Sequence, residues 1–437
     1  MTMRHGIATA CGLLLLMLAP VPARSAVPDT SGVPTLRSGV RVLDVRENGI
    51  VRPADWTVDP SIALDEYRTG PVAGPARLTF VSDVDSLTIE VEPGHPREFA
   101  VLLGDSVRCM ARIVCQAGLT RAPGGTGPVE LPLRWSRNRK LTIRARINGS
   151  PELNLLFDSG AADLTLYRSG VKKVGGIETD GEVLNHASGG STVRRVRRSN
   201  TLEIGPLRGE GIPVMVVESQ PEPVDGIVGF RMFADRTLEF DFEREKIVVH
   251  DSLPALPAGF TSLPLLWSGT LHSVNARVQT ERGTFDVPFV MDTGLNGTFN
   301  LGAATSGRLG LPEGVKALGW SKGKGLGENK LRLQRLRFRA LELGGTRLSE
   351  IPGFALAASD TGAVMGDLLG MEVLRRFRFF LDYRGNALVL APNRDLGEHY
   401  RRGGRGGSGS NVAITIAILV ALGAGEGARR KRRGGQL

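Results

Sequence analysis

Short runs of alternating apolar and polar residues recur along this chain, and they predict a protein built mainly of β-strands. In residues 141–147 every second side chain is apolar, the period of a strand with one buried face. Asn148-Gly149 follows, a pair that favours a hairpin turn, and the apolar run 153–157 comes next. The same order returns later in the chain, with strands predicted at 274–278 and 285–291.

The repetition extends past these strands. Each half contains two apolar residues followed by a glycine, and then an Asp-containing hairpin. One constant offset maps Gly229 onto Gly370 and Asp241 onto Asp382. Such self-similarity indicates a duplicated unit, and about 130 residues are enough for each copy to bury its own core.

Each half also has an acidic tripeptide at the end of an apolar run, Asp158-Ser159-Gly160 in the first and Asp292-Thr293-Gly294 in the second. A third copy, which begins at Asp360, does not follow a strand-like run, so we interpret it as a turn. Small residues after each Asp suit a tight loop that exposes the carboxylate. Two such carboxylates, brought together, cannot both ionise cheaply and would share one proton.

These features resemble the pepsin/retropepsin superfamily of aspartic proteases in its bacterial two-lobed form. The resemblance covers residues 128–394 and implies two pseudo-symmetric retropepsin-like β lobes, at 128–254 and 255–394. It implies an endopeptidase that hydrolyses a protein or peptide substrate, with Asp158 and Asp292 as the catalytic pair. No metal and no organic cofactor are implied.

The resemblance also implies supporting roles around the two Asp residues. Ser159 and Thr293 are expected to hydrogen-bond across the lobe interface, and Gly160 and Gly294 to let backbone approach the carboxylates. Two apolar segments are expected to pack behind the catalytic loops and hold them rigid: Ile227, Val228 and Gly229 in the first half, and Leu368, Leu369 and Gly370 in the second.

Retropepsin-like halves place a Gly-rich hairpin, or flap, over the active site. The candidates are the stretch around Gly189 and Gly190 and the stretch around Gly325 and Gly327. Both could equally be ordinary surface loops. Leu295 departs from the family's pattern, because it cannot make the hydrogen bond that Ser or Thr would make there; it either packs or weakens the site.

Two alternatives to a protease stay open. The Asp residues could be turn residues of a duplicated β protein, or the scaffold could be a non-catalytic, surface-displayed binding or assembly module. Other hydrolase classes lack their signatures: there is no His-Glu-x-x-His, and no Gly-x-Ser-x-Gly in a strand–turn–helix context. The Gly-rich stretch 323–327 lacks P-loop spacing.

The two ends of the chain predict export. Residues 1–25 have the basic end, apolar stretch and small-x-small site of a secretory signal peptide. Residues 395–437 combine a Gly/Arg-rich linker, a short apolar helix and a basic cluster. They resemble C-terminal sorting signals of the GlyGly type, which a membrane protease trims; a tail anchor and an unprocessed tail are the alternatives. We therefore expect a periplasmic or cell-surface protein, membrane-associated through its C-terminus or released after processing.

The basic tail also accounts for most of the net charge. Residues 401–437 hold eight Lys and Arg residues and one Glu, out of a net charge of +10 for the whole chain. The remainder is nearly balanced, so the charge gives no support to a nucleic-acid partner.

Residues 26–127 are predicted to form a small N-terminal β-domain, with the role of inhibitory prosegment, substrate-docking module or structural cap left open. Cys109 and Cys115 lie in it, and in an oxidising compartment we expect a disulfide between them. Two buried thiols are the alternative.

Overall fold

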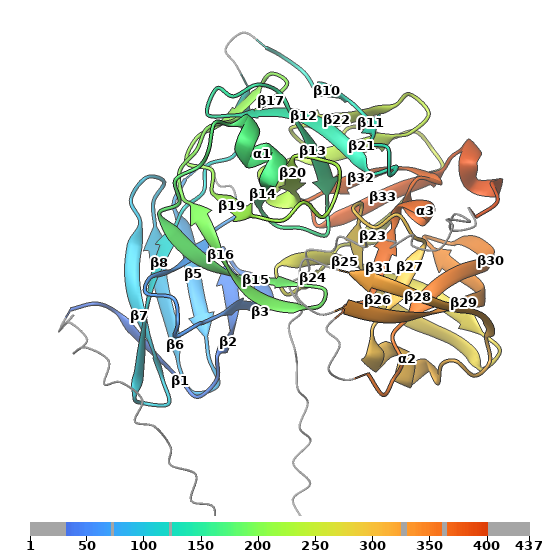
Figure 1. Ribbon diagram of the computed structural model, residues 1–437, viewed down its shortest axis with the longest axis horizontal. Helices are drawn as coiled ribbons and strands as arrows, with labels where there is room; N and C mark the ends of the chain where they lie inside the picture. The colour runs from blue at the N-terminus through green and yellow to red at the C-terminus, as the bar shows by residue number, and fades with distance from the viewer. Residues whose placement is uncertain (1–31, 71–73, 122–124, 325–329, 361–364, 401–437) are drawn as a thin grey trace, which may run out of the picture. The chain divides into compact units, whose positions relative to one another are not determined.

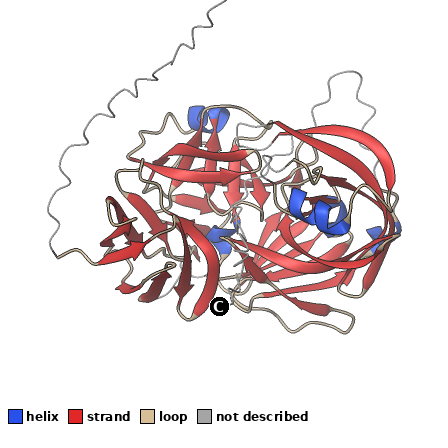
Figure 2. Cartoon of the chain, turned by 90° about the horizontal axis from the view of Figure 1, so that it is seen from below, coloured by secondary structure: helices blue, strands red, loops and turns tan. Residues whose placement is uncertain are grey.

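β-strands dominate the computed structural model, which describes residues 32–70, 74–121, 125–324, 330–360 and 365–400 (Figure 1). The predicted signal peptide and nearly all of the predicted C-terminal tail lie outside these ranges. Helices are few and short, as Figure 2 shows: α1 (Arg168–Lys173), α2 (Ala303–Leu309), α3 (Met371–Leu374) and the 3₁₀ turns η1 (Phe230–Phe233) and η2 (Arg394–Gly397). Among the described residues no helix is long and apolar enough to cross a membrane. The prediction of a mainly β fold is confirmed.

The N-terminal part consists of two four-stranded sheets, ordered β1-β7-β8-β4 and β3-β2-β5-β6. Their strands are β1 (Thr35–Ser38), β2 (Val42–Glu47), β3 (Ile50–Thr57), β4 (Asp65–Arg68), β5 (Ala76–Val81), β6 (Ser86–Val91), β7 (Arg97–Leu103) and β8 (Val107–Val114). Alternate residues of β2 and β5 are buried in one shared core. Aromatic rings fill it, with Trp56 edge-on to Phe80 at 5.5 Å between ring centroids.

The predicted disulfide is wrong, because Cys109 and Cys115 are not bonded to each other. Cys109 lies in β8 and Cys115 just after it, six residues along an extended chain. Extended backbone advances about 3.3 Å per residue, so the two thiols are about 20 Å apart, whereas a disulfide needs Cα atoms within about 7 Å. Both side chains are buried in the core instead.

The first half is an eleven-stranded sheet in which one strand pairs with both strands that flank the first acidic loop. β13 (Leu153–Asp158) leads into the first acidic tripeptide, and β14 (Leu164–Tyr167) leaves it. β20 (Gly226–Gly229) lies between them, parallel to β13 and antiparallel to β14. The other strands of the sheet are β9 (Thr120–Arg121), β11 (Arg134–Trp135), β12 (Leu141–Ile147), β15 (Gly181–Ala187), β16 (Gly190–Arg197), β17 (Leu202–Ile204), β18 (Leu207–Gly209) and β19 (Val214–Val217).

The second half repeats this arrangement. β26 (Gly283–Asp292) leads into the second tripeptide, β27 (Phe299–Leu301) follows it, and β31 (Leu368–Gly370) is parallel to β26 and antiparallel to β27. Asp158 pairs with Gly229 in the first half, and Asp292 pairs with Gly370 in the second. The remaining strands of this eight-stranded sheet are β24 (Leu266–Ser268), β25 (Leu271–Thr280), β28 (Lys316–Lys324), β29 (Lys330–Leu343) and β30 (Thr346–Ala355).

A six-stranded sheet joins the two halves, in the order β10-β22-β21-β32-β33-β23. Its strands are β10 (Val129–Pro132), β21 (Thr237–Asp241), β22 (Lys246–His250), β23 (Thr261–Pro264), β32 (Phe377–Asp382) and β33 (Ala387–Pro392). β21 and β32, one from each half, pair antiparallel at its centre, and the rings of Phe240 and Phe379 stack at 4.5 Å. This shared sheet fixes the two acidic loops relative to each other.

The cysteine arrangement gives a direct test. In the chain unfolded without reductant, Cys109 and Cys115 should both react with an alkylating reagent, because the strand geometry holds them apart. Peptide mapping by mass spectrometry measures this, with a pre-reduced sample as the control. Alkylation of the two residues that appears only after reduction would contradict the structure.

Candidate active site

The two halves bring Asp158 and Asp292 together at the ends of β13 and β26. Gly160 and Gly294 make this approach possible: a Cβ on Gly160 would lie 2.9 Å from Cγ of Asp292, and one on Gly294 would lie 2.5 Å from Oδ2 of Asp158. Each carboxyl thus occupies the space that a side chain on the opposite loop would need. A larger residue at either glycine would push the carboxyls apart.

Both carboxyl-bearing residues are 0% exposed. The expectation that the loops expose the carboxylates is therefore wrong. The reason is geometric, since each carboxyl faces the opposite loop rather than the solvent.

Ser159 and Thr293 connect the two loops by four hydrogen bonds. The backbone N–H of Ser159 donates to Oγ1 of Thr293 at 3.0 Å, and the N–H of Thr293 donates to Oγ of Ser159 at 3.1 Å. The Ser159 hydroxyl then donates to the carbonyl of Met291 at 2.7 Å, and the Thr293 hydroxyl to that of Phe157 at 2.9 Å. All four are buried, so losing one partner would leave a buried polar group unsatisfied.

The two apolar-apolar-Gly segments lie directly beside the acidic loops as β20 and β31. Their members are fully buried or nearly so: Ile227, Val228, Gly229, Leu368, Leu369 and Gly370. Gly229 and Gly370 are required by close backbone contact. A Cβ on Gly229 would meet the backbone of Ala162 at 2.4 Å, and one on Gly370 the carbonyl oxygen of Gly297 at 2.3 Å.

Leu295 packs into the core. It is 2% exposed, and its side chain lies against the position of Gly370. Its backbone N–H donates to the carbonyl of Asp292 at 3.2 Å, just as Ala161 donates to that of Asp158. The loop turn is therefore the same in both halves despite the larger side chain.

Asp360 lies in a turn, as interpreted, with its N–H donating to the carbonyl of Ala357.

The electrostatics of the pair favour one shared proton. Burial raises the pKa of Asp158, and burial together with the charge of Asp158 raises the pKa of Asp292 well above the usual carboxyl range. The two groups therefore titrate as one coupled pair. Among the residues described, no three His, Cys, Asp or Glu side chains form a group that could hold a metal ion.

A buried lysine beside the pair was not foreseen from the sequence. Lys140, 2% exposed, donates from Nζ to the carbonyl of Gly294 and lies 3.7 Å from Oε1 of Glu222. Its positive charge lowers the pKa of both Asp158 and Asp292. A lysine at the start of a strand with alternating apolar and polar residues is expected to be solvent-exposed. The sequence therefore holds no signal for this buried contact.

The first candidate flap is a hairpin of β15 and β16, with Gly189 and Gly190 both in the left-handed region of φ. Its tip is buried at Ala187, Ser188 and Gly189, and Ala187 packs in a small apolar cluster with Ala161 of the first acidic loop. The second candidate belongs to the hairpin of β28 and β29. Gly325 and Gly327 lie outside the described residues.

Comparison with known proteins gives one partial family match and one distant structural similarity. Residues 143–232 match the model of a protein family described as aspartyl protease; the matched segment contains Asp158 and β20. No curated protein matches the chain. A solved structure, an aspartic proteinase from Irpex lacteus, is similar at 14% identity with a TM-score of 0.41, over 63% of this chain and 100% of that chain. The family match covers the segment that carries Asp158 and β20, so this part of the chain is similar to aspartyl proteases.

The raised pKa values predict how Asp292→Asn changes stability. In the folded protein the pair holds its proton to a higher pH than the unfolded chain does, so ionisation destabilises the fold as pH rises. Asn removes this penalty. We expect Asp292→Asn to melt at least about 2 °C above the unmodified protein at pH 7, with the difference vanishing near pH 3, where both carboxyls are protonated.

Differential scanning calorimetry over this pH range measures the effect. Asp360→Asn, the turn aspartate of the third tripeptide, is the matched control and should show no such gain. A lower melting temperature for Asp292→Asn at pH 7 would contradict the shared-proton assignment.

Proposed function

We propose that this protein is an exported aspartic endopeptidase, with Asp158 and Asp292 as its catalytic pair. The observation that carries the proposal is the placement of two carboxyls from equivalent loops against each other, each in the space left by the glycine of the opposite loop. The four hydrogen bonds of Ser159 and Thr293 support it by fixing the loops that carry these carboxyls.

The chemistry follows from one proton held by two carboxyls. The ionised carboxyl takes a proton from a water molecule, whose oxygen attacks the peptide carbonyl carbon. The protonated carboxyl donates to the carbonyl oxygen as negative charge develops there. The tetrahedral intermediate then collapses, the C–N bond breaks, and the leaving nitrogen takes a proton from the pair. No covalent bond to the protein forms.

Lys140 is proposed as a positioning residue for this reaction. Its ammonium group keeps a positive charge near the pair, which helps one carboxyl stay ionised in a buried site. Its contact with the Gly294 carbonyl ties the residue just before β12 in the first half to the acidic loop of the second.

Export and membrane association belong to the same proposal and rest on the sequence alone. The features are the signal-like residues 1–25 and the tail 395–437, with its Gly-rich linker, apolar stretch and basic cluster. Processing of that tail by a membrane protease, or anchoring through it, would keep the catalytic halves outside the cytoplasm.

One observation favours a second candidate function. Complete burial of both carboxyls is what a binding or assembly module on a protease scaffold would show, since such a module has no need to admit water. The retained pair and its supporting residues favour the protease.

A cleavage assay tests the proposed function. Residues 26–400 should cleave members of a diverse peptide library between acidic and neutral pH. Asp158→Asn and Asp292→Asn should each reduce cleavage by at least about 10³-fold, because an amide cannot replace either carboxyl in a shared-proton pair. Mass spectrometry of the products measures the loss and gives the specificity.

Asp360→Asn again serves as the control and should retain the activity of the unmodified chain. Undiminished activity in either active-site variant would rule out the pair. Cleavage by none of the proteins would favour the binding module.

Lys140→Met should shift the acidic limb of the pH–rate profile to higher pH. The lysine lowers the pKa of both carboxyls, so without it the pair ionises only at a higher pH and the acidic limb moves toward neutrality. Profiles of kcat against pH measure the shift. Lys246→Met, which removes the same charge from the surface pair with Glu130, should leave the profile in place. An unmoved acidic limb in a folded Lys140→Met protein would exclude the positioning role.

A further inference from the structure

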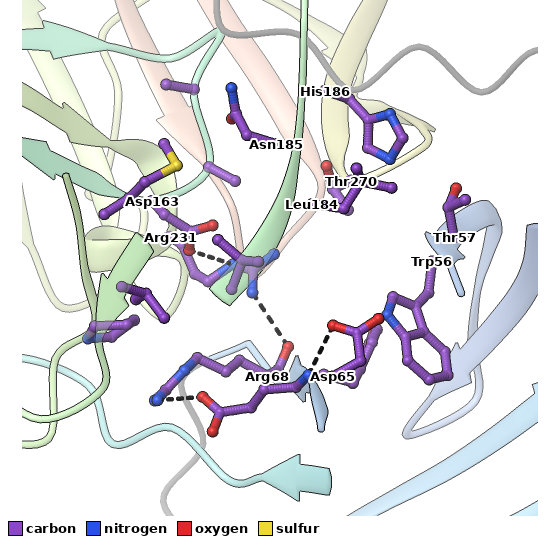
Figure 3. Close-up of a pocket in the computed structure, with 18 of the residues that line it drawn as sticks. Trp56, Thr57, Asp65, Arg68, Asp163, Leu184, Asn185, His186, Arg231 and Thr270 are labelled. Carbon is purple, nitrogen blue, oxygen red and sulfur yellow. Dashed lines mark hydrogen bonds and ion pairs between the residues drawn. The ribbon is translucent and has the colours of Figure 1, made fainter. Parts of the chain in front are cut away.

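Two cavities in the described part of the chain differ in how their arginines are engaged. The cavity beside the first acidic loop has Arg68 and Arg231 in its lining (Figure 3). Each of them is paired with an acid, Arg68 with Glu66 and Arg231 with Asp163. A second cavity, of about 890 Å³, lies on the second half, where β28, β29 and β30 meet residues 396–400.

The arginines of this second cavity are free of acidic partners. Arg335 and Arg337 of β29 and Arg347 of β30 line it, and within the part of the chain that the structure describes no ion pair involves any of them. Glu342 lies across the strand pair from Arg347, but it is paired with Arg277 instead. The three guanidinium groups are therefore available to an external anion.

Two acids share the lining of the cavity with these arginines. Oε2 of Glu398 is 2.9 Å from Nη1 of Arg375, so its charge is already neutralised. Glu350 is then the one acid of the described lining to set against three arginines. The cavity therefore carries a net positive charge.

The neighbouring strand adds further positive charge. Lys316 of β28 lies directly opposite Arg337, and Lys322 lies directly opposite Arg332. Like charges directly opposite each other destabilise a sheet, and a bound anion would offset that cost. We call the surface formed by Lys316 and the three arginines of the cavity the basic face.

The described part of the chain ends at this basic face. Residues 396–400 line the cavity, and the guanidinium of Arg376 lies 4.5 Å from the ring centroid of Tyr400. The apolar stretch of the predicted tail begins at Val412. The intervening chain spans at most about 40 Å when extended, so a tail held in a membrane would keep the basic face within that distance of it. Such a short tether gives even a weak contact a high effective concentration.

We propose that the basic face binds an anionic phospholipid surface and holds the second half of the protein against it. Guanidinium groups form paired hydrogen bonds with phosphate oxygens, and an anionic leaflet attracts each exposed Lys or Arg. The position of the predicted tail favours a membrane over another polyanion. The inference rests on the membrane association proposed for the tail and adds a second contact, made by the folded part of the protein.

Vesicle flotation measures this contact. The protein is mixed with vesicles of phosphatidylcholine, either alone or with phosphatidylglycerol as the anionic lipid. The triple variant Arg335→Gln, Arg337→Gln, Arg347→Gln should bind the anionic vesicles at least about tenfold more weakly than the unmodified protein. High salt should remove the difference between the two proteins, because it screens exposed charges.

A matched control removes the same charge elsewhere. Arg46, Arg77 and Arg97 are exposed on the N-terminal domain. The triple variant Arg46→Gln, Arg77→Gln, Arg97→Gln should bind anionic vesicles as the unmodified protein does. Equal melting temperatures of the three proteins check that the substitutions leave the fold intact.

A tail variant separates this inference from the anchoring on which it rests. Ile418→Asp places a charge in the apolar stretch and should abolish the binding to neutral vesicles that persists in high salt. Unchanged binding by Ile418→Asp would reject the tail as an anchor. The contribution of the three arginines to binding of anionic vesicles should remain in the Ile418→Asp background.

The outcomes decide the inference whatever the tail does. Weaker binding of anionic vesicles that is confined to the Arg335, Arg337 and Arg347 variant supports the basic face as a lipid contact. Equal binding by that variant and the unmodified protein, or an equal loss in the control variant, would overturn it. If the variant loses affinity for a short DNA duplex but not for vesicles, the face takes a nucleic acid and the inference is wrong.

Discussion

The reciprocal hydrogen bonds between Ser159 and Thr293 are the constraint on which the rest of the site depends. Each hydroxyl accepts from the backbone N–H of the other residue and donates to a carbonyl of the opposite strand. The loops can therefore meet in one register only. That register places the carboxyls face to face and makes glycine necessary at 160 and 294. The six-stranded sheet then holds the two halves in the arrangement that this contact requires.

This arrangement stores unfavourable electrostatics in the middle of the fold. Burial raises the pKa of both carboxyls, the charge of Asp158 raises that of Asp292 further, and a buried lysine offsets part of the cost. In the proposed protease, such a site would trade stability for reactivity. The fully buried strands β20 and β31 lie beside the loops and leave them no space to relax.

The sequence predicted the repeat well because strand periodicity and glycine positions are local properties. The strand 141–147 coincides with β12, and Asn148 and Gly149 both have the positive φ of the expected turn. It could not predict Lys140, whose burial depends on a loop of the other half. Nor could it exclude the disulfide, because two cysteines six residues apart are compatible with a loop as well as with the strand β8. The prediction that the carboxylates are exposed was wrong for the same reason that the burial of Lys140 could not be predicted. Both depend on how two loops distant in the sequence face each other.

The most direct measurement of the central claim is the titration of the two carboxyls themselves. In the chain labelled with ¹³C at Asp Cγ, difference spectra against Asp158→Asn and Asp292→Asn assign the two signals. A coupled pair predicts that both signals respond to both titration steps, with the later step well above the ordinary carboxyl range. Two independent transitions near the pKa of a free aspartate would contradict a shared proton, and with it the account of this site.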